Sequence, residues 1–333
     1  MTVLEWVKAL PKSKKALPLL SFPSVTLTKE SVYTVTHDAT KQAEGVKAIA
    51  DALPLAAAVT MMDLSVEAEA FGADIATSED EVPTVLGELI SAEEDGIEGA
   101  MALRVPEVGD GRTALYVEAA KLAKSMVTDR PTFAGIIGPY SLAGRLMGVT
   151  EALMNCLCEE EFTHEILRKT TDFLKAYAKA YKDAGLDGIV MAEPLAGLLS
   201  PDLEETFSAP YVKEIIDAVQ DDSFAVIYHN CGPNIADMTE SLAKNGAAAY
   251  HFGDAVDLVT MLERMPKDAV VMGNISPSEQ FVSGTPESMK AEVESLLERA
   301  AGFDNFVLSS GCDIPPHAKW DNIRAFVDAR EAK

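Results

Sequence analysis

The sequence lacks a hydrophobic segment long enough to cross a lipid bilayer. A membrane-spanning helix needs about 20 consecutive apolar residues, and no run among the 333 residues approaches that length. The N-terminus also lacks the continuous apolar centre of a secretory signal, because charged residues such as Glu5, Lys8 and Lys12 interrupt its short apolar stretches. We therefore expect a cytoplasmic protein without a membrane partner.

Basic residues are scarce. The chain has 28 Lys and Arg residues against 53 Asp and Glu residues, which gives a formal net charge of -25. Such a surface repels phosphate backbones and anionic lipids, so we expect neither nucleic acid nor a membrane surface as a partner. A basic or neutral protein partner is compatible with this charge. So is the simpler interpretation that the charge keeps an abundant enzyme soluble.

Cysteine is also rare, with four residues in the whole chain. In a reducing compartment, scattered cysteines are more often buried side chains, metal ligands or nucleophiles than disulfide partners. Cys156 and Cys158 lie two positions apart in an expected helix, so their side chains diverge, and we expect both to be buried small hydrophobic residues. Cys231 and Cys312 remain as candidates for chemistry.

The sequence has no low-complexity segment and no short repeat. No Gly-x-Gly-x-x-Gly turn follows its early apolar runs, which argues against a dinucleotide-binding sheet. Short apolar runs instead alternate with longer amphipathic ones. The expected strands are residues 56–61, 102–105, 132–137, 188–191, 224–228, 248–252, 269–272 and 305–308. The expected helices include residues 115–127, 161–184, 203–219, 235–245, 256–265 and 286–301.

This alternation predicts the fold class. Near-continuous apolar strands separated by helices indicate a parallel sheet that is buried on both faces. Eight such units favour a closed (β/α)8 barrel, or TIM barrel, over an open sheet. We expect a single barrel domain over residues 1–333, in which residues 1–50 form an N-terminal extension that covers the barrel. Residues 17–28 would be an additional strand or part of that cover.

Metal-binding residue types follow several expected strands, where the active site of a parallel barrel lies. His229 and Cys231 are two positions apart at one strand end, so both side chains point to the same side, and Cys312 follows the last expected strand. One nitrogen and two sulfurs suit tetrahedral Zn²⁺ and leave a fourth position for substrate. The sequence therefore predicts a zinc site. A Cys–His nucleophile pair is the main alternative, and a purely structural role is the third.

Four further polar residues at strand ends are candidates for the same site. Glu193, His251 and Asp254 would serve as a fourth ligand or as neighbours of the ligands. Asp63 follows an apolar strand and precedes a short Leu-Ser-Val stretch. That position fits either a helix cap or a catalytic carboxylate.

The chain resembles the uroporphyrinogen decarboxylase superfamily over most of its length, from about residue 17 to residue 329. The similarity is carried by MMDLSVEAEAFG at residues 61–72, FAGIIGPYSLA at 133–143, and SGCDIP at 310–315 with NIRAF at 322–326. Within the superfamily the chain is similar to the corrinoid-dependent zinc methyltransferases, of the methylcobalamin:coenzyme M and O-demethylase types. The resemblance implies a (β/α)8 barrel, in agreement with the strand count.

Two motifs separate the chain from the decarboxylase branch. Decarboxylases carry an Arg-Gln-Ala-Gly-Arg-Tyr segment that helps to bind the substrate's carboxylates, whereas the matching residues 21–26 read SFPSVT. They also carry Gly-His-Gly where this chain has Gly311-Cys312-Asp313. Asp63 does match their catalytic aspartate. A very acidic chain without those arginines is poorly suited to an octa-anionic porphyrinogen, so uroporphyrinogen decarboxylation is the alternative function.

The resemblance to the methyltransferases implies that His229, Cys231 and Cys312 hold zinc. It further implies that a methyl group moves between the cobalt of a corrinoid (cobalamin) on a partner protein and a small molecule. That molecule is an acceptor thiol in one type, and a methylated donor such as a phenyl methyl ether in the other, which occurs in anaerobic bacteria. The metal triad fits both, but Asp63 and Glu193, taken as catalytic groups, favour the ether. A non-catalytic corrinoid or tetrapyrrole binder is a further hypothesis.

Overall fold

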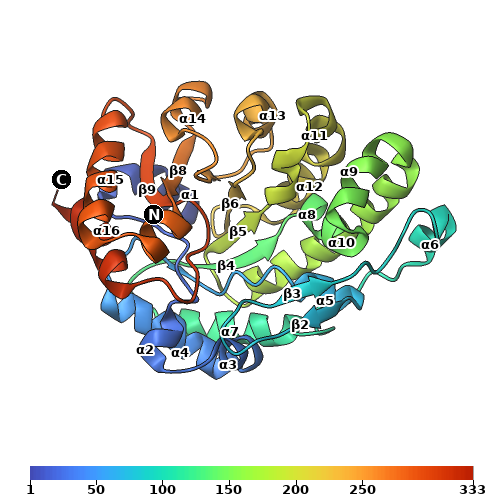
Figure 1. The fold of residues 1–333 in the computed structure, drawn as a ribbon, viewed down its shortest axis with the longest axis horizontal. Coiled ribbons are helices and arrows are strands. Elements are labelled where there is room, and N and C mark those ends of the chain that lie inside the picture. The colour runs from blue at the N-terminus through green and yellow to red at the C-terminus, as the bar shows by residue number, and fades with distance from the viewer. Residues whose placement is uncertain (333) are drawn as a thin grey trace.

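Seven parallel strands form a curled sheet at the centre of the molecule, seen in a computed structural model that describes residues 1–332 (Figure 1). The sheet order is β1-β4-β5-β6-β7-β8-β9, so each strand from β4 onward pairs with the next one along the chain. The strands are β1 (Ala58–Val59), β4 (Thr132–Ile137), β5 (Gly188–Ala192), β6 (Ala225–Asn230), β7 (Ala249–Phe252), β8 (Val270–Ile275) and β9 (Phe306–Ser310). A separate antiparallel pair consists of β2 (Asp74–Ala76) and β3 (Thr84–Leu86).

The N-terminal segment 16–20 lies between the two edge strands of this sheet and closes the barrel. Leu17 donates its N–H to a carbonyl of β9 at 3.0 Å, and Ala56, just before β1, donates to the carbonyl of Ala16 at 3.0 Å. The segment does not form a regular strand ladder, because Pro18 has no N–H to donate. Seven strands and this segment together make the eight positions of a (β/α)8 barrel.

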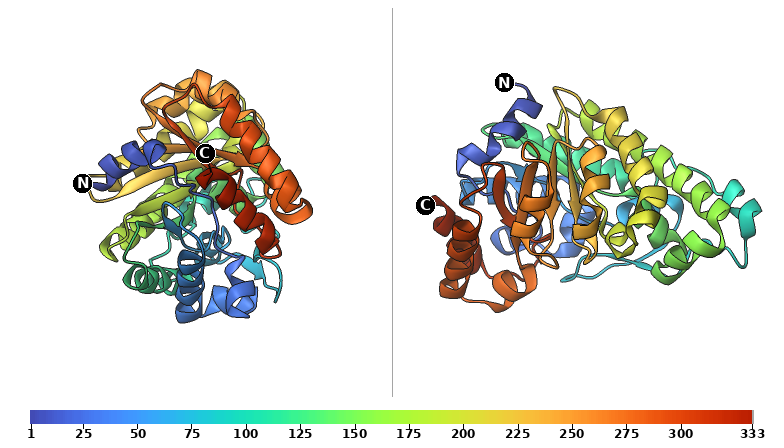
Figure 2. Two further views of the ribbon diagram at one scale, coloured as in Figure 1. Left: turned by 90° about the vertical axis from the view of Figure 1, so that its left-hand side faces the viewer. Right: turned by 90° about the horizontal axis from the view of Figure 1, so that it is seen from above.

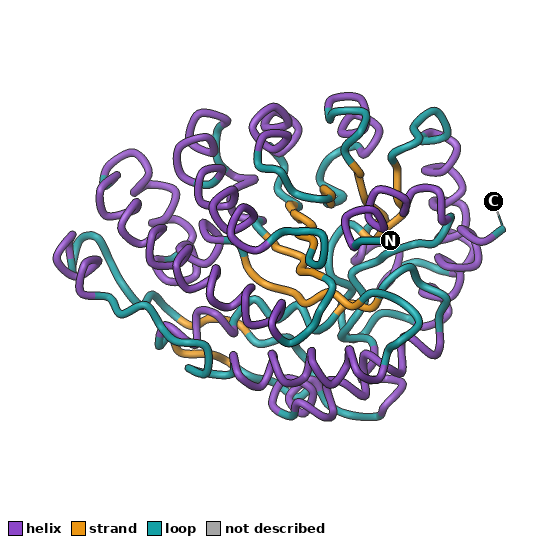
Figure 3. Tube along the Cα trace, turned by 180° about the vertical axis from the view of Figure 1, so that it is seen from behind, coloured by secondary structure: helices purple, strands orange, loops and turns teal. Residues whose placement is uncertain are grey.

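Helices surround the strands on the outside (Figures 1 and 3). In Figure 1, α11, α13 and α14 lie along the upper side and α2, α3, α4 and α7 along the lower side. The helices are α1 (Val3–Ala9), α2 (Ser24–Thr28), α3 (Val32–His37), α4 (Ala39–Ala52), α5 (Val66–Phe71), α6 (Gly96–Ala102), α7 (Thr113–Met126), α8 (Pro139–Met147), α9 (Val149–Cys158), α10 (Glu160–Asp183), α11 (Pro201–Phe207), α12 (Ala209–Val219), α13 (Thr239–Lys244), α14 (Leu258–Arg264), α15 (Pro286–Arg299) and α16 (Trp320–Glu331). Short 3₁₀ or π turns are η1 (Leu10–Ser13), η2 (Pro194–Leu198), η3 (Ile235–Met238) and η4 (Pro277–Ser283). Within residues 1–332, no helix is long and apolar enough to cross a membrane.

Helix α1 closes the end of the barrel at which the strands begin (Figure 2). The ring of Trp6 lies 5.9 Å from that of Phe133 in β4, and Val3 donates its N–H to the carbonyl of Asp222, just before β6, at 2.8 Å. Val7 belongs to the same buried cluster as the inward-facing residues of the strands. The carboxyl ends of the strands, where a barrel carries its active site, are therefore at the opposite end.

Residues 102–105, expected to be a strand, form a loop. Helix α6 ends at Ala102, and the exposed Arg104 donates to Asp110 at 2.8 Å. A four-residue run that contains a solvated arginine cannot be buried on both faces, as a strand inside a parallel barrel must be. The eighth position of the barrel belongs to the N-terminal segment instead.

The stretch 203–219, expected to be one helix, forms two. Helix α11 ends at Phe207 and α12 begins at Ala209. Pro210 stands in the first turn of α12, where its missing N–H costs nothing, but it would remove a hydrogen bond from the interior of a continuous helix. The break therefore follows from one residue.

Candidate metal centre

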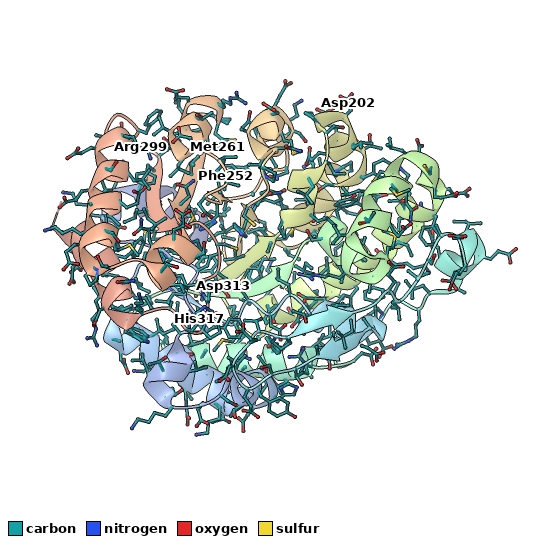
Figure 4. The ribbon with its side chains drawn as sticks, viewed as in Figure 1. Asp202, Phe252, Met261, Arg299, Asp313 and His317 are labelled. Carbon is teal, nitrogen blue, oxygen red and sulfur yellow. The ribbon has the colours of Figure 1, made fainter. Side chains whose placement is uncertain are left out.

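The carboxyl ends of β6 and β9 bring the three predicted metal ligands together. His229 lies in β6, Cys231 follows that strand, and Cys312 follows β9. Their ligand atoms all lie within 4.8 Å of one another, and Cys312 Sγ is 3.5 Å from His229 Nε2. In Figure 4, Asp313, which follows Cys312, lies toward the middle of the view, whereas Arg299 lies among the outer helices.

The spacing of these atoms fits zinc. A tetrahedral ion with Zn–S bonds of about 2.3 Å and Zn–N bonds of about 2.0–2.1 Å holds its ligand atoms about 3.5–3.8 Å apart. The distance of 3.5 Å between His229 Nε2 and Cys312 Sγ matches this range. The other distances between ligand atoms are at most 4.8 Å, and small side-chain rotations would shorten them to the same range. Among residues 1–332, no other group of His, Cys, Asp and Glu side chains converges in this way.

Cys231 and Cys312 are coupled to each other. A hydrogen bond with Cys312 lowers the pKa of Cys231, and the same bond together with burial raises the pKa of Cys312. The pair therefore favours one sulfur as a thiolate, which is the form that binds metals. Gly253, after β7, permits this packing, because a Cβ at that position would overlap the Cβ of Cys231.

A second buried histidine lies behind His229. His251, in β7, is paired with His229 in the β6–β7 register, and the Nδ1 atoms of the two rings are 2.7 Å apart. The Nε2 atom of His251 lies 2.7 Å from the Oγ of Ser309 in β9. Burial lowers the pKa of His251 well below its usual range, so the ring is neutral. Two roles were expected for His251, a fourth ligand or a neighbour of the ligands, and its position beside the predicted ligand His229 fits the second.

A pocket of about 340 Å³ opens beside Cys231. Its wall is largely apolar and includes Leu64, Ile137 and Leu198. Arg145 also lines the pocket, and within residues 1–332 its side chain has no ion-pair or hydrogen-bond partner. The pocket thus offers a small molecule an apolar wall, one cation and a cysteine sulfur.

Asp63 is buried, and all of its acceptor capacity is used. Its Oδ2 accepts from Arg112 Nη1 at 2.7 Å and from the Tyr116 hydroxyl at 2.8 Å. Its Oδ1 accepts from the backbone N–H of Ser65 at 3.1 Å and from the Ser65 hydroxyl at 2.6 Å. An ionised carboxylate has about four lone-pair sites, so this carboxylate anchors a buried ion pair after β1.

Both carboxylate oxygens of Glu193 bind the N-terminus of α8. Glu193 is fully buried after β5 and accepts from the backbone N–H of Tyr140 at 3.1 Å and of Ser141 at 2.5 Å. Burial raises the pKa of Glu193 to about 7, while the positive end of the helix dipole favours the ionised form. Because Ser141 and Leu195 line the pocket, Glu193 holds one wall of the pocket in place.

Three other residues were singled out from the sequence: Asp254, which lies near Cys231, and the two cysteines of α9. Asp254 is close enough for its charge to oppose the lowering of the Cys231 pKa, but its carboxylate is not among the converging ligand atoms. Cys156 is buried, as expected, and its Sγ lies within hydrogen-bond distance of the Tyr140 hydroxyl. The expectation that Cys158 is also buried is wrong, because residues two apart on α9 face different sides and Cys158 is exposed.

Three residues of the site were not singled out from the sequence. Arg112 and Ser309 act through partners that are distant in the chain, so no short spacing marks them. Arg145 did leave a signal. It is the one charged residue between residues 131 and 150, and arginine is over-represented where proteins recognise carboxylate or phosphate groups.

The comparisons with known proteins agree with the fold and identify the family. The family model for uroporphyrinogen decarboxylase (URO-D) matches residues 23–332. The chain is 28% identical over 270 residues to a methylcobamide:CoM methyltransferase of Methanosarcina acetivorans, covering 80% of this chain and 76% of that protein. It is also 28% identical over 222 residues to a uroporphyrinogen decarboxylase of Prochlorococcus marinus, covering 64% of this chain and 62% of that protein.

A solved structure shows the same fold. A methyltransferase from Methanosarcina mazei matches with a TM-score of 0.85 at 24% sequence identity, covering 100% of this chain and 99% of that chain. The likeness thus extends over the whole barrel, including the N-terminal segment that closes it. Because the family model also covers nearly the entire chain, this protein belongs to the uroporphyrinogen decarboxylase family.

Proposed function

We propose that the protein is a zinc-dependent methyltransferase, which moves a methyl group between the cobalt of a corrinoid on a partner protein and a small substrate bound beside Cys231. The observation that carries this proposal is the convergence of His229, Cys231 and Cys312 at the edge of a largely apolar pocket. The relatives that are named methylcobamide:CoM methyltransferases support it.

The proposed ligand set leaves room for a substrate. His229, Cys231 and Cys312 account for three of the four positions of a tetrahedral ion. Cys231 also lines the pocket, so a molecule bound there lies next to the metal-binding residues. When bound, zinc would supply a Lewis acid that keeps a thiol deprotonated at neutral pH. The apolar wall of the pocket limits the hydration of a sulfur held there.

We infer a thiol acceptor rather than an ether donor. As catalytic groups, Asp63 and Glu193 would favour the ether. In the structure, however, Asp63 binds Arg112, and Glu193 binds the N-terminus of α8. Neither is left to act on a substrate. Arg145 supplies a cation for an anionic tail. A small anionic thiol, such as the CoM in the relatives' names, therefore suits the pocket.

The corrinoid would approach from outside the pocket. A volume of about 340 Å³ is at the lower end of the range for small-molecule sites, about 300–1,000 Å³, so it suits a small thiol and not a corrin ring. Val149 and Leu198, which line the pocket, are 47% and 42% exposed. These two side chains would offer an approaching partner some exposed apolar surface beside the pocket.

The test is an anaerobic methyl-transfer assay. Zinc-loaded protein is mixed with methylcobalamin and 2-mercaptoethanesulfonate, and the visible spectrum reports the loss of the cobalt–carbon bond. We expect Cys312→Ala to lose at least about 100-fold in rate, because losing even an outer contact of a metal site costs about 10–100-fold. Cys158→Ala is the matched control, since Cys158 is exposed on α9. Thiol methylation that is equally fast in Cys312→Ala would contradict the proposal.

Two further substrates separate the alternatives. Cob(I)alamin with a phenyl methyl ether tests the opposite direction, and demethylation of the ether without thiol methylation would reverse the substrate assignment. Uroporphyrinogen tests decarboxylation, for which Asp63→Asn should abolish coproporphyrinogen formation. Coproporphyrinogen formed without any methyl transfer would replace the proposed function by the alternative one.

A further inference from the structure

We propose that His251 and Ser309 are positioning residues for the metal centre: together with the Leu17 carbonyl they fix the proton of His229 on Nδ1 and so direct its Nε2 lone pair at the metal. This inference rests on the proposed function, because it assumes that His229 is a ligand. It adds two residues and a segment from the far end of the chain to the site.

The direction of each hydrogen bond can be derived by starting at the Leu17 carbonyl and following the contacts through Ser309 and His251 to His229. The Leu17 carbonyl can only accept, so the Ser309 hydroxyl donates to it, at 2.7 Å. With its single proton used, Ser309 Oγ accepts from His251 Nε2–H at 2.7 Å. A neutral imidazole that is protonated on Nε2 is an acceptor at Nδ1. His251 Nδ1 therefore accepts from His229 Nδ1–H at 2.7 Å.

A second contact leads to the same tautomer of His229. The backbone carbonyl of His251 lies 3.3 Å from His229 Nδ1, and a carbonyl oxygen cannot donate. Both contacts thus place the proton on Nδ1 and leave Nε2 as a lone pair. That lone pair is on the side of Cys312, whose Sγ lies 3.5 Å from Nε2.

Burial makes this arrangement specific. His251 and Ser309 are fully buried and His229 is 1% exposed, so water does not compete for these bonds. Turning either ring would leave a buried polar nitrogen without a partner, which costs about 1–3 kcal/mol. The two rings are also held edge to face, with centroids 4.7 Å apart and an interplanar angle of 71°. The series of contacts His229–His251–Ser309–Leu17, called the relay below, consists of two imidazole rings, a hydroxyl and a carbonyl. None of these groups is an anion, so the relay orients His229 without adding negative charge at the metal.

The relay also connects the metal centre to the closure of the barrel. Ser309 lies in β9, and Leu17 lies in the N-terminal segment between β9 and β1. The first segment of the chain thus contributes the last acceptor of a network that starts at a proposed metal ligand. A metal ligand that is an imidazole commonly has such a partner on its other nitrogen, and loss of that partner lowers metal affinity about 10–100-fold.

Zinc affinity of matched variants tests this inference. In His251→Asn the amide oxygen occupies the position of Nδ1 and still accepts from His229. In His251→Gln the amide reaches toward Ser309, and His229 Nδ1 keeps only the longer contact of 3.3 Å to the backbone carbonyl of residue 251. We expect the zinc dissociation constant, measured by competition with a chromogenic chelator, to rise about 10–100-fold in His251→Gln and to stay near the wild-type value in His251→Asn.

Ser309→Ala is the second variant, because it removes one hydroxyl and leaves both rings in place. It should also weaken zinc binding, whereas His164→Asn, a histidine that contacts Tyr211 away from the site, should not. Equal zinc affinity in all variants, or equal losses in His251→Asn and His251→Gln, would overturn the relay while leaving the proposed function intact. Wild-type protein that binds no stoichiometric zinc would overturn both.

Discussion

The guanidinium of Arg112 donates to Asp63, to Ser65 and to Glu69, and its side chain is 8% exposed. The Asp63 carboxylate at the other end of the ion pair is also buried. When two opposite charges are buried together, removing one of them leaves the other buried without a counter-charge, which strongly destabilises the folded state. This pair therefore explains why an aspartate that matches a catalytic position can serve the fold of this chain.

We expect Arg112→Met to destabilise the protein by about 3–5 kcal/mol, because it leaves the Asp63 charge buried without a counter-charge. Arg104→Met is the control: Arg104 pairs with Asp110, but its side chain is 68% exposed, and the loss of an exposed pair costs about 0–1 kcal/mol. Urea unfolding of both variants measures the difference. Equal stability of the two variants would show that the Asp63–Arg112 pair does not support the fold.

Glu67 is another buried carboxylate, and one of its two oxygens has no hydrogen-bond partner among the described residues. It is 1% exposed, and its other oxygen accepts from the backbone N–H of Ile137 at 2.9 Å. Burial raises its pKa from an ordinary 4.5 to about 8. The folded state therefore binds this proton more tightly than the unfolded state does. The stability that depends on it decreases as the pH rises from about 4.5 to about 8.

Glu67→Gln should accordingly gain stability relative to wild type as the pH rises from 6 to 8, by at most about 1.4 kcal/mol per pH unit. The amide oxygen still accepts from Ile137, and the charge is removed. Urea unfolding at both pH values, with a chelator present so that metal binding does not contribute, measures this change. Glu240→Gln, on an exposed side chain, controls for the loss of a surface carboxylate. A pH-independent difference between Glu67→Gln and wild type would refute the assignment.

At the residue scale, the sequence alone predicts the three proposed metal ligands, but it does not predict the residues that hold them in place. His229 and Cys231 share a strand end, and Cys312 carries the same chemistry at another, so residue type and position are enough to single them out. Arg112 binds Asp63 across 49 positions of the chain, and Ser309 lies 58 positions from His251. Only the fold specifies such partners.

Among the elements, the N-terminal segment 16–20 decides whether the barrel is closed. Its backbone bonds to β9 on one side and to the residue before β1 on the other. Leu17 and Leu19 are buried in the same cluster as the inward-facing residues of the strands. The segment therefore does the work of an eighth strand without the regular ladder of one.

Leu17→Ala should destabilise the protein by about 2–5 kcal/mol, the usual cost of truncating a fully buried leucine. Leu157→Ala makes the same change on α9, where the side chain is 70% exposed, and should cost no more than about 0.5 kcal/mol. Hydrogen exchange of the β1 and β9 amides offers a direct readout. Protection of those amides that is the same in Leu17→Ala and in wild type would contradict a closing role for the segment.

The elements also show why part of the fold was predictable. Strands such as β4 and β5 are continuous apolar runs, because both faces of a barrel strand are buried. The segment 16–20 has the apolar character of a strand, but the sequence alone does not decide between an additional strand and part of a cover. In the structure Pro18 interrupts the pattern of donors. Residues 102–105 show the opposite case. Their sequence predicts a short strand, but in the structure no strand pairs with them.

At the scale of the whole molecule, the proposed metal centre depends on the complete barrel. Its proposed ligands come from β6 and β9, which are three places apart in the sheet, and the relay behind them ends in the N-terminal segment. No local stretch of the chain could form this site alone. The net charge of -25 gives the molecule a surface that repels polyanions, while the pocket beside Cys231 has an apolar wall and a cation.

The most direct test is X-ray absorption at the zinc edge of the purified protein, which counts the sulfur neighbours of the metal. Two sulfurs at about 2.3 Å and at least one nitrogen at about 2.0–2.1 Å are predicted for the wild type, with a third sulfur after addition of a small anionic thiol. One protein sulfur should remain in Cys231→Ser and in Cys312→Ser. Zinc surrounded only by nitrogen and oxygen, or two protein sulfurs that persist in both variants, would contradict a metal centre built from His229, Cys231 and Cys312.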